Sequence, residues 1–185
     1  MAKKNESMIL LDVLAKEILD SRLIAELTGD FVRLCEPASP LKEIKVHVEC
    51  PDRTLALRID KAKVNGLFRK GRGQLRRCDC VIFTEVQEQK YLVFIEMKHK
   101  NNGSEGIVQQ FKGAECLVDY IASVLDRFYK EKYVFNEYKK RFVLFYKASI
   151  PKKTTRLKKQ QKENDVPERY LRKLAADKLW IGELV

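Results

Sequence analysis

The segment RRCDCVIFTEVQEQKYLVFIEMKHK, residues 76–100, restricts the possible folds of this chain more than any other feature. Two apolar runs, 78–86 and 91–98, flank the short polar segment QEQK. Apolar residues occupy both alternating sets of positions in each run, which is typical of central strands covered on both faces. The segment therefore predicts a β-hairpin in the middle of a sheet.

Three charged residues interrupt this hairpin at the end away from its turn. Asp79 opens the first run, and Glu96 and Lys98 close the second. Pairing Val86 with Tyr91 would set Asp79 opposite Lys98, and slipping the register by two would set Asp79 opposite Glu96. Side chains alternate with period two along a strand, so all three project from one face in either register.

Two neighbouring carboxylates raise each other's pKa unless a positive charge lies between them. Mg²⁺ fits that position, because it takes oxygen ligands and one or two carboxylates from the protein. The backbone carbonyl of Met97 would add a further oxygen. Lys98 could then orient or deprotonate water and stabilise charge on phosphorus. The open alternative is an Asp79–Lys98 cross-strand salt bridge worth ~0.2–1 kcal/mol, which leaves Glu96 unexplained.

The remaining segments predict one α/β domain, because helical and strand patterns follow one another and 185 residues suffice for a single core. The segment 152–162 is a basic linker, and we expect residues 151–185 to pack on the core formed by 1–150. The expected elements are a helix over 6–30, a strand over 42–50 with its hairpin partner over 53–64, a helix over 105–130, a strand over 141–146 and a terminal helix over 167–180.

A strand with Asp, a hairpin and an apolar strand ending in Glu-x-Lys resembles the PD-(D/E)xK nuclease superfamily. The matching residues are Asp79 and Glu96-Met97-Lys98, and the resemblance spans roughly residues 6–147. It implies a restriction-endonuclease-like core, with a central mixed sheet flanked by helices in α-β-β-β-α-β order. Cys78 stands at the family's nominal proline, a position that varies among its members.

The resemblance also implies a chemistry and a set of roles. It implies Mg²⁺-dependent hydrolysis of phosphodiesters, with Mn²⁺ as a substitute, Asp79 and Glu96 as metal ligands, and Lys98 near the attacking water. Many members place a glutamine on the helix after the motif. Gln110 lies on the apolar face of that helix, but adjacent Gln109 and a simple position at the core rim remain alternatives.

Some members of this superfamily carry a further glutamate on the first helix. Glu17 and Glu26 are the candidates here, and Glu26 lies beside the apolar stripe of residues 6–30. The resemblance therefore implies Glu26 as an additional metal ligand.

The net charge of +11 indicates a polyanionic partner, for which nucleic acid is the commonest choice. The cations cluster in 69–77, which holds five, and in 152–162, which holds six without an acidic residue. Such contacts position a backbone without reading base sequence. The residues expected to contact phosphate are Arg69, Lys70, Arg72, Arg76, Arg77, Lys152, Lys153, Arg156, Lys158 and Lys159.

The composition also bears on the cellular compartment. Five cysteines form no CxxC pair, which favours reduced, buried thiols. No apolar run approaches the ~20 residues that cross a bilayer, and the first residues lack a secretory pattern. We therefore expect a cytoplasmic protein without a membrane partner.

Together these features predict a metal-dependent nuclease acting on DNA rather than RNA, in restriction, phage defence or repair. The alternative is a non-catalytic, basic nucleic-acid-binding or scaffold subunit of a larger complex that retains the nuclease fold. A homodimer, or a subunit active only within a multi-protein complex, is compatible with both.

Overall fold

The hairpin formed by residues 80–98 lies at the centre of a five-stranded sheet. Its strands β5 (Cys80–Val86) and β6 (Gln89–Lys98) are antiparallel, with Cys80 opposite Ile95 and Val86 opposite Gln89. This is the second of the two expected registers, and its continuation sets Asp79 opposite Glu96.

The turn of this hairpin is tighter than the four residues expected from the sequence. Only Gln87 and Glu88 connect the strands, and both adopt left-handed backbone with φ of 48° and 64°. Two residues with positive φ match the twist of the flanking strands. The carboxylate of Glu49 also accepts a hydrogen bond of 2.9 Å from the Gln87 N–H.

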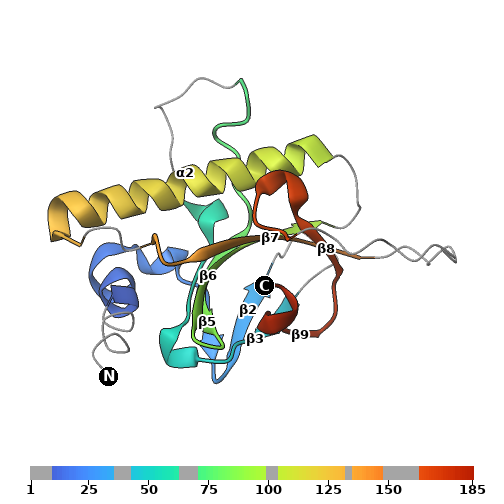
Figure 1. Cartoon of the computed structure of the whole chain (residues 1–185), viewed down its shortest axis with the longest axis horizontal. Helices are drawn as coiled ribbons and strands as arrows, with labels where there is room; N and C mark the ends of the chain where they lie inside the picture. Colours follow the sequence, from blue (N-terminus) through green and yellow to red (C-terminus); the bar gives the residue numbers. More distant parts are fainter. Residues whose placement is uncertain (1–9, 36–42, 63–70, 99–103, 132–134, 148–162) are drawn as a thin grey trace, which may run out of the picture.

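The computed structural model describes residues 10–35, 43–62, 71–98, 104–131, 135–147 and 163–185 as an α/β protein with two mixed sheets (Figure 1). The first has the strand order β4-β5-β6-β7-β8, in which β4 is antiparallel to β5 whereas β7 and β8 run parallel to β6. Its other strands are β4 (Leu55–Leu57), β7 (Lys139–Tyr146) and β8 (Leu171–Leu174), of which β4 and β8 are the edges.

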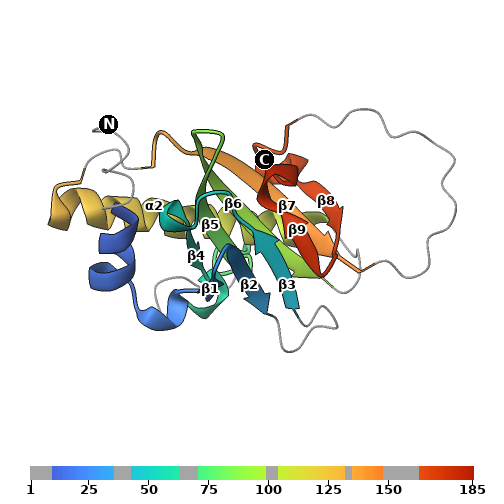
Figure 2. The same ribbon diagram turned by 90° about the horizontal axis from the view of Figure 1, so that it is seen from below.

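The second sheet has four strands in the order β1-β2-β3-β9 and lies against the first (Figure 2). In it β3 is antiparallel to β2 and parallel to β9. Its strands are β1 (Leu27–Thr28), β2 (Phe31–Cys35), β3 (Glu43–His47) and β9 (Lys178–Trp180).

The two faces of the five-stranded sheet pack against different layers. One face packs against α2 (Ser104–Tyr129), where the rings of Phe94 and Phe142 stack at 4.8 Å and Phe111 of α2 meets Phe142 at 5.3 Å. The opposite face packs against the four-stranded sheet. The sequence predicted a sheet flanked by helices. The structure instead has a helix on one face of the sheet and a second sheet on the other.

The expected first helix, residues 6–30, is wrong beyond residue 18. The described part is helical over 10–18 and ends in the π-helical segment Leu14–Ile18. After a 3-10 turn at Ser21–Leu23, the chain forms β1 and β2, joined at Gly29 with φ of 61°. Pairing with β3 buries alternate residues of β2, and this long-range contact outweighs the local helical spacing.

The expected terminal helix over 167–180 is also wrong. The chain forms a 3-10 turn at Pro167–Arg169 and then β8 and β9. Tyr170 packs into the core beneath α2 and Leu171 packs against the other core, as neighbouring residues of a strand do. Residues 163–185 therefore contribute one strand to each sheet, β8 to the five-stranded sheet and β9 to the four-stranded sheet.

The expected hairpin between 42–50 and 53–64 does not form. β3 pairs with β2 and β9, whereas β4 pairs with β5.

Among the described residues, no helix is long and apolar enough to span a bilayer.

The chain that leads into β5 crosses α2 at a glycine. A Cβ atom on Gly113 would lie 1.8 Å from the carbonyl oxygen of Arg76, far inside van der Waals contact. Gly113 therefore lets the backbone of residue 76 run directly against the helix, which fixes where Arg77 and Asp79 enter the sheet.

We expect Gly113→Ala to lower the free energy of unfolding by about 1–3 kcal/mol, because the added methyl group forces backbone apart. Helix propensity alone would predict the opposite sign, a gain of up to ~1 kcal/mol. Urea unfolding measures the change. Gly71→Ala, where a Cβ meets only the Gln74 side chain at 3.9 Å, is the control and should change stability by no more than ~0.5 kcal/mol. A Gly113→Ala protein as stable as the wild type would contradict the crossing.

Candidate functional site

Glu96 is the most unusual residue of the five-stranded sheet. Its side chain is 0% exposed and lies on the α2 face of β6. Burial, and then the nearby charge of Asp79, raise the pKa of the Glu96 carboxyl to about 8, although Lys98 and Gln110 oppose the shift. Neither carboxylate oxygen accepts a well-aligned hydrogen bond from the described residues. Buried carboxylates rarely lack such partners, because desolvation is costly.

Lys98 is the counter-charge of this carboxylate. It lies two residues beyond Glu96 on the same face, and its ammonium forms an ion pair with Glu96 Oε1. The Lys98 side chain is 37% exposed, so it joins the buried carboxylate to the open end of the strand.

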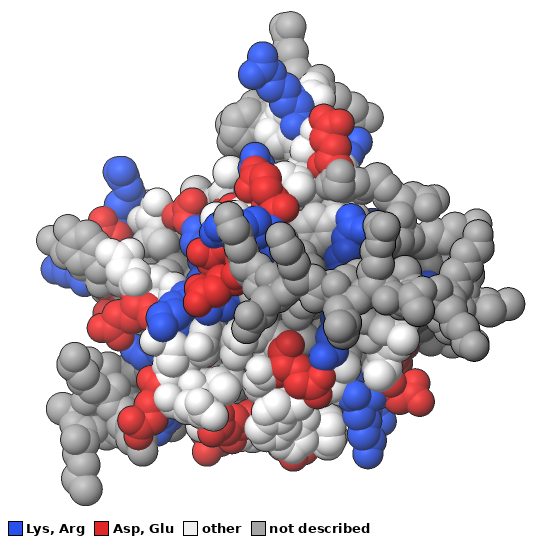
Figure 3. Space-filling model, turned by 45° about the vertical axis from the view of Figure 1, so that its right-hand side comes forward, with Lys and Arg blue, Asp and Glu red and all other residues white. Residues whose placement is uncertain are grey.

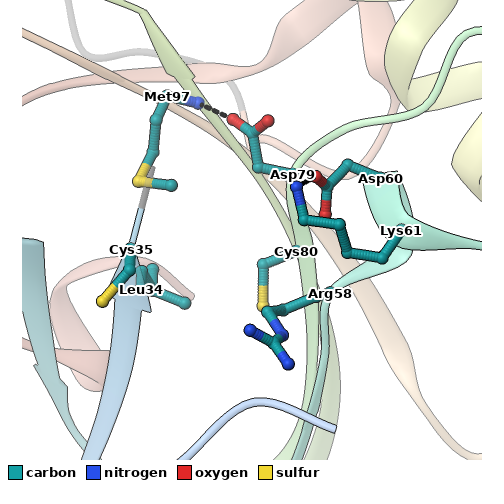
Figure 4. Close-up of a pocket in the computed structure, with 8 residues that line it drawn as sticks. All are labelled: Leu34, Cys35, Arg58, Asp60, Lys61, Asp79, Cys80 and Met97. Carbon is teal, nitrogen blue, oxygen red and sulfur yellow. Dashed lines mark hydrogen bonds and ion pairs between the residues drawn. The ribbon is translucent and has the colours of Figure 1, made fainter. Parts of the chain in front are cut away.

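Asp79 lies directly before β5, at the position opposite Glu96. Its Oδ2 accepts a hydrogen bond of 2.6 Å from the N–H of Met97 (Figure 4). The side chain thus takes the place of a backbone acceptor where the ladder ends. Met97 is joined to Asp79 through its N–H, and its carbonyl oxygen as a metal ligand stays a prediction.

The helix α2 contributes Gln110 and not Gln109 to this site. Gln110 Nε2 donates a hydrogen bond of 3.3 Å to the carbonyl of Arg77, and its side chain lies close enough to Glu96 to lower that pKa. Gln109 instead donates to Glu105 at 3.5 Å. The structure therefore brings together Asp79, Glu96, Lys98 and Gln110, the four residues expected to be catalytic.

Asp60 is an acidic neighbour that the sequence analysis missed. With Asp79 it lines a small pocket of about 30 Å³, and its carboxylate pairs with Lys61 at 2.6 Å (Figure 4). Burial raises the pKa of the Cys80 thiol, which lines the same pocket, well above its usual range, and the charges of Asp79 and Asp60 add to the shift. In the sequence, Asp60 follows closely after β4. This position indicates that Asp60 lies near Asp79 only when β4 is known to pair with β5.

Glu26 does not occupy the helical position on which its assignment as a metal ligand depended. It lies outside the first helix, next to β1, and its side chain is 61% exposed. Hydrogen bonds from Arg33, at 3.1 Å, and from Thr28 lower the pKa of its carboxyl. Glu17, the other candidate, is exposed. The Glu26 assignment assumed a helix continuing to residue 30, which the β1–β2 pairing replaces, whereas Glu17 lies within the helical residues 10–18.

Three of the arginines expected to contact phosphate are described. Arg72 and Arg76 are exposed. Arg77 is half-buried, and its guanidinium donates to the carbonyl of Ala62, while burial lowers its pKa. Arg77 therefore uses one of its N–H groups to hold the backbone at Ala62, and its contact with phosphate stays a prediction. The other expected phosphate contacts lie outside the described residues, and they are Arg69, Lys70, Lys152, Lys153, Arg156, Lys158 and Lys159.

The described residues contain no group of three or more His, Cys, Asp and Glu side chains able to hold a metal. Asp79 and Glu96 instead offer two carboxylates, and the buried one, Glu96, pairs with Lys98 but accepts no well-aligned hydrogen bond from the described residues. Two protein carboxylates suit Mg²⁺, which keeps several waters, whereas zinc sites use three or four protein ligands. The residues therefore fit a hard divalent cation.

Comparisons with known proteins give no further guide to this site. No protein-family model, no curated protein and no solved structure matches the chain.

The raised pKa of Glu96 predicts a pH-dependent stability in metal-free buffer. Folded protein keeps a proton on Glu96 that the unfolded chain releases above about pH 4.5, so this contribution is complete below that pH. It is lost as pH rises through about 8. We expect Glu96→Gln to remove a slope of up to ~1.4 kcal/mol per pH unit and to raise stability at pH 8 by roughly 2–4 kcal/mol.

Chemical denaturation between pH 5 and 8.5 in EDTA measures this difference. Glu131→Gln, at an exposed glutamate just after α2, is the control and should keep the wild-type slope. Parallel slopes for wild type and Glu96→Gln would show that Glu96 titrates normally.

Proposed function

We propose that the protein is a Mg²⁺-dependent nuclease with a PD-(D/E)xK-like core, which hydrolyses phosphodiester bonds of nucleic acid, with DNA as the substrate. The observation that carries the proposal is the buried Glu96 carboxylate, which faces Asp79, pairs with Lys98 and lacks well-aligned hydrogen bonds from the described residues. A simple Asp79–Lys98 salt bridge would not account for it, because Lys98 pairs with Glu96.

The arrangement of elements supports the same proposal. Helical residues 10–18 are followed by antiparallel β4, β5 and β6, then by α2, and then by β7 parallel to β6. This sequence of elements is compatible with the α-β-β-β-α-β order implied by the resemblance if β1–β3 are treated as an insertion after the first helix. The acidic residues lie where β5 begins and β6 ends.

Asp79 and Glu96 are the residues that would hold the cation. When bound there, Mg²⁺ would polarise a phosphoryl oxygen and acidify water. The Met97 N–H fixes the carboxylate of Asp79. The cost of burying the Glu96 carboxylate, which Lys98 offsets only in part, would be offset further by a divalent charge.

Lys98 and Gln110 would act on the reacting groups. Lys98, which pairs with Glu96 and is partly exposed, would supply a positive charge that stabilises negative charge on the phosphoryl oxygens. Gln110 anchors the Arg77 carbonyl and lies beside Glu96, so it keeps the carboxylate oriented. The exposed Arg72 and Arg76 would contact the nucleic-acid backbone next to the first turns of α2.

A cleavage panel of plasmid, single-stranded DNA and RNA, each with Mg²⁺ or Mn²⁺, tests this proposal. We expect Asp79→Asn and Glu96→Gln each to reduce the cleavage rate by at least ~100-fold, because removing even a group that supports a metal ligand costs 10–100-fold. The matched control is Asp119→Asn on the exposed side of α2, which should cleave at the wild-type rate.

Calorimetric titration with Mn²⁺ adds a readout that is independent of turnover. Heat of binding in the wild type that is absent from Glu96→Gln would support the metal site. Nucleic-acid binding that persists without cleavage in any divalent metal would instead favour the non-catalytic binding subunit.

A further inference from the structure

The carboxyl ends of β6, β7 and β8 meet at the edge of the sheet that carries the candidate site. In this parallel arrangement Glu96 lies beside Leu144, and Leu144 lies beside Arg172. Lys98 and Tyr146 form the next row outward. Neighbours in register point to the same face, so Arg172 shares the α2 face with Glu96 and Lys98. Ligands of such sheets commonly bind beyond the carboxyl ends of the strands.

Arg172 is held in a defined orientation by the tyrosine two residues before it. Its guanidinium lies over the ring of Tyr170, 5.3 Å from the centroid, and its Nη2 donates a hydrogen bond of 2.9 Å to the Tyr170 hydroxyl. Tyr170 is itself buried against Phe111 of α2, with ring centroids 5.8 Å apart. A cation–π contact with the buried tyrosine and a hydrogen bond donated to its hydroxyl thus orient an otherwise exposed side chain.

The charge of Arg172 is not neutralised in the way that neighbouring charges are. Arg169 pairs with Asp165, Lys173 with Glu183, and Lys112 of α2 with Glu168. Figure 3 likewise shows cations and carboxylates interspersed on the face that it draws. Within the described ranges, Arg172 forms no ion pair with any carboxylate.

An arginine that is oriented but not neutralised is suited to binding an anion. Its planar group can donate two parallel hydrogen bonds to a phosphate, and less side-chain entropy is lost because the orientation already exists. Two strand spacings separate the backbones of Arg172 and Glu96, which is roughly 10 Å. That separation places the guanidinium beside a reacting phosphodiester and not on it.

We propose that Arg172 binds a phosphate of the nucleic-acid backbone next to the one held at Asp79 and Glu96. The strand of nucleic acid then runs across the carboxyl ends of β6, β7 and β8. This inference rests on the proposed function for the position of the reacting phosphate, but the phosphate contact itself does not require catalysis.

The test measures binding of the full chain to fluorescent DNA and RNA oligonucleotides in EDTA, over a range of salt concentrations. We expect Arg172→Ala to weaken binding by about 10-fold or more, because hydrogen bonds to charged groups are worth ~1.5–3 kcal/mol. The slope of log affinity against log salt should fall by about 0.7–0.9, as for the loss of one phosphate contact. Arg172→Lys should keep the slope and lose part of the affinity.

The matched control is Lys173→Ala, which removes the same charge from the neighbouring position of β8. Lys173 points to the opposite face and is paired with Glu183, so binding should change less than 2-fold. Tyr170→Phe should weaken binding less than Arg172→Ala does, since it removes the hydroxyl acceptor and keeps the ring. Circular dichroism confirms folding, and Arg172→Lys carries the test if Arg172→Ala fails to fold.

The outcomes separate this inference from the proposed nuclease activity. Selective loss of binding in Arg172→Ala without any cleavage by the wild type would support the phosphate contact and reject the nuclease. Equal binding by wild type and Arg172→Ala, equal losses in Arg172→Ala and Lys173→Ala, or no binding by the wild type would each overturn the inference. In those cases, cleavage of nucleic acid by the wild type would still support the proposed nuclease activity.

Discussion

The buried carboxylate of Glu96 is the constraint on which the candidate site depends. A charge removed from water must be compensated, and here the compensation comes from Lys98 and from a proton held up to a pKa of about 8. Asp79 opposes that compensation, because its charge raises the same pKa. In the proposed site, a bound divalent cation would turn this repulsion between two neighbouring carboxylates into a shared set of ligands.

Several backbone features place these side chains. The two-residue turn at Gln87 and Glu88 sets the register that brings position 79 opposite Glu96. The Met97 N–H then holds the Asp79 carboxylate where the β5–β6 ladder ends. On the other side, the close crossing at Gly113 brings the chain before β5 against α2, so that Gln110 reaches the Arg77 carbonyl. The site is thus assembled from a strand start, a strand end and a helix whose relative positions are fixed by packing.

The positively charged side chains near this site differ in how their charges are used. Arg77 is used to hold backbone, and many surface cations are paired with carboxylates. Arg172 differs from these cations because its partner is an aromatic ring, which orients the guanidinium without neutralising its charge. Net charge alone describes attraction to polyanions, whereas the pairing of individual cations indicates which of them remain available for a ligand.

The sequence by itself determined the central hairpin, the long helix α2 and the shared face of Asp79, Glu96 and Lys98, because these follow from short-range periodicity. Only the tertiary structure decided the register, the choice of Gln110 over Gln109, the place of Glu26 next to β1 and the position of Arg172. Residues 24–35 and 170–180 carry helical spacing as well as strand alternation, and their pairing partners lie far away in sequence. Strand pairing depends on those distant partners, so no local pattern in the chain could reveal it.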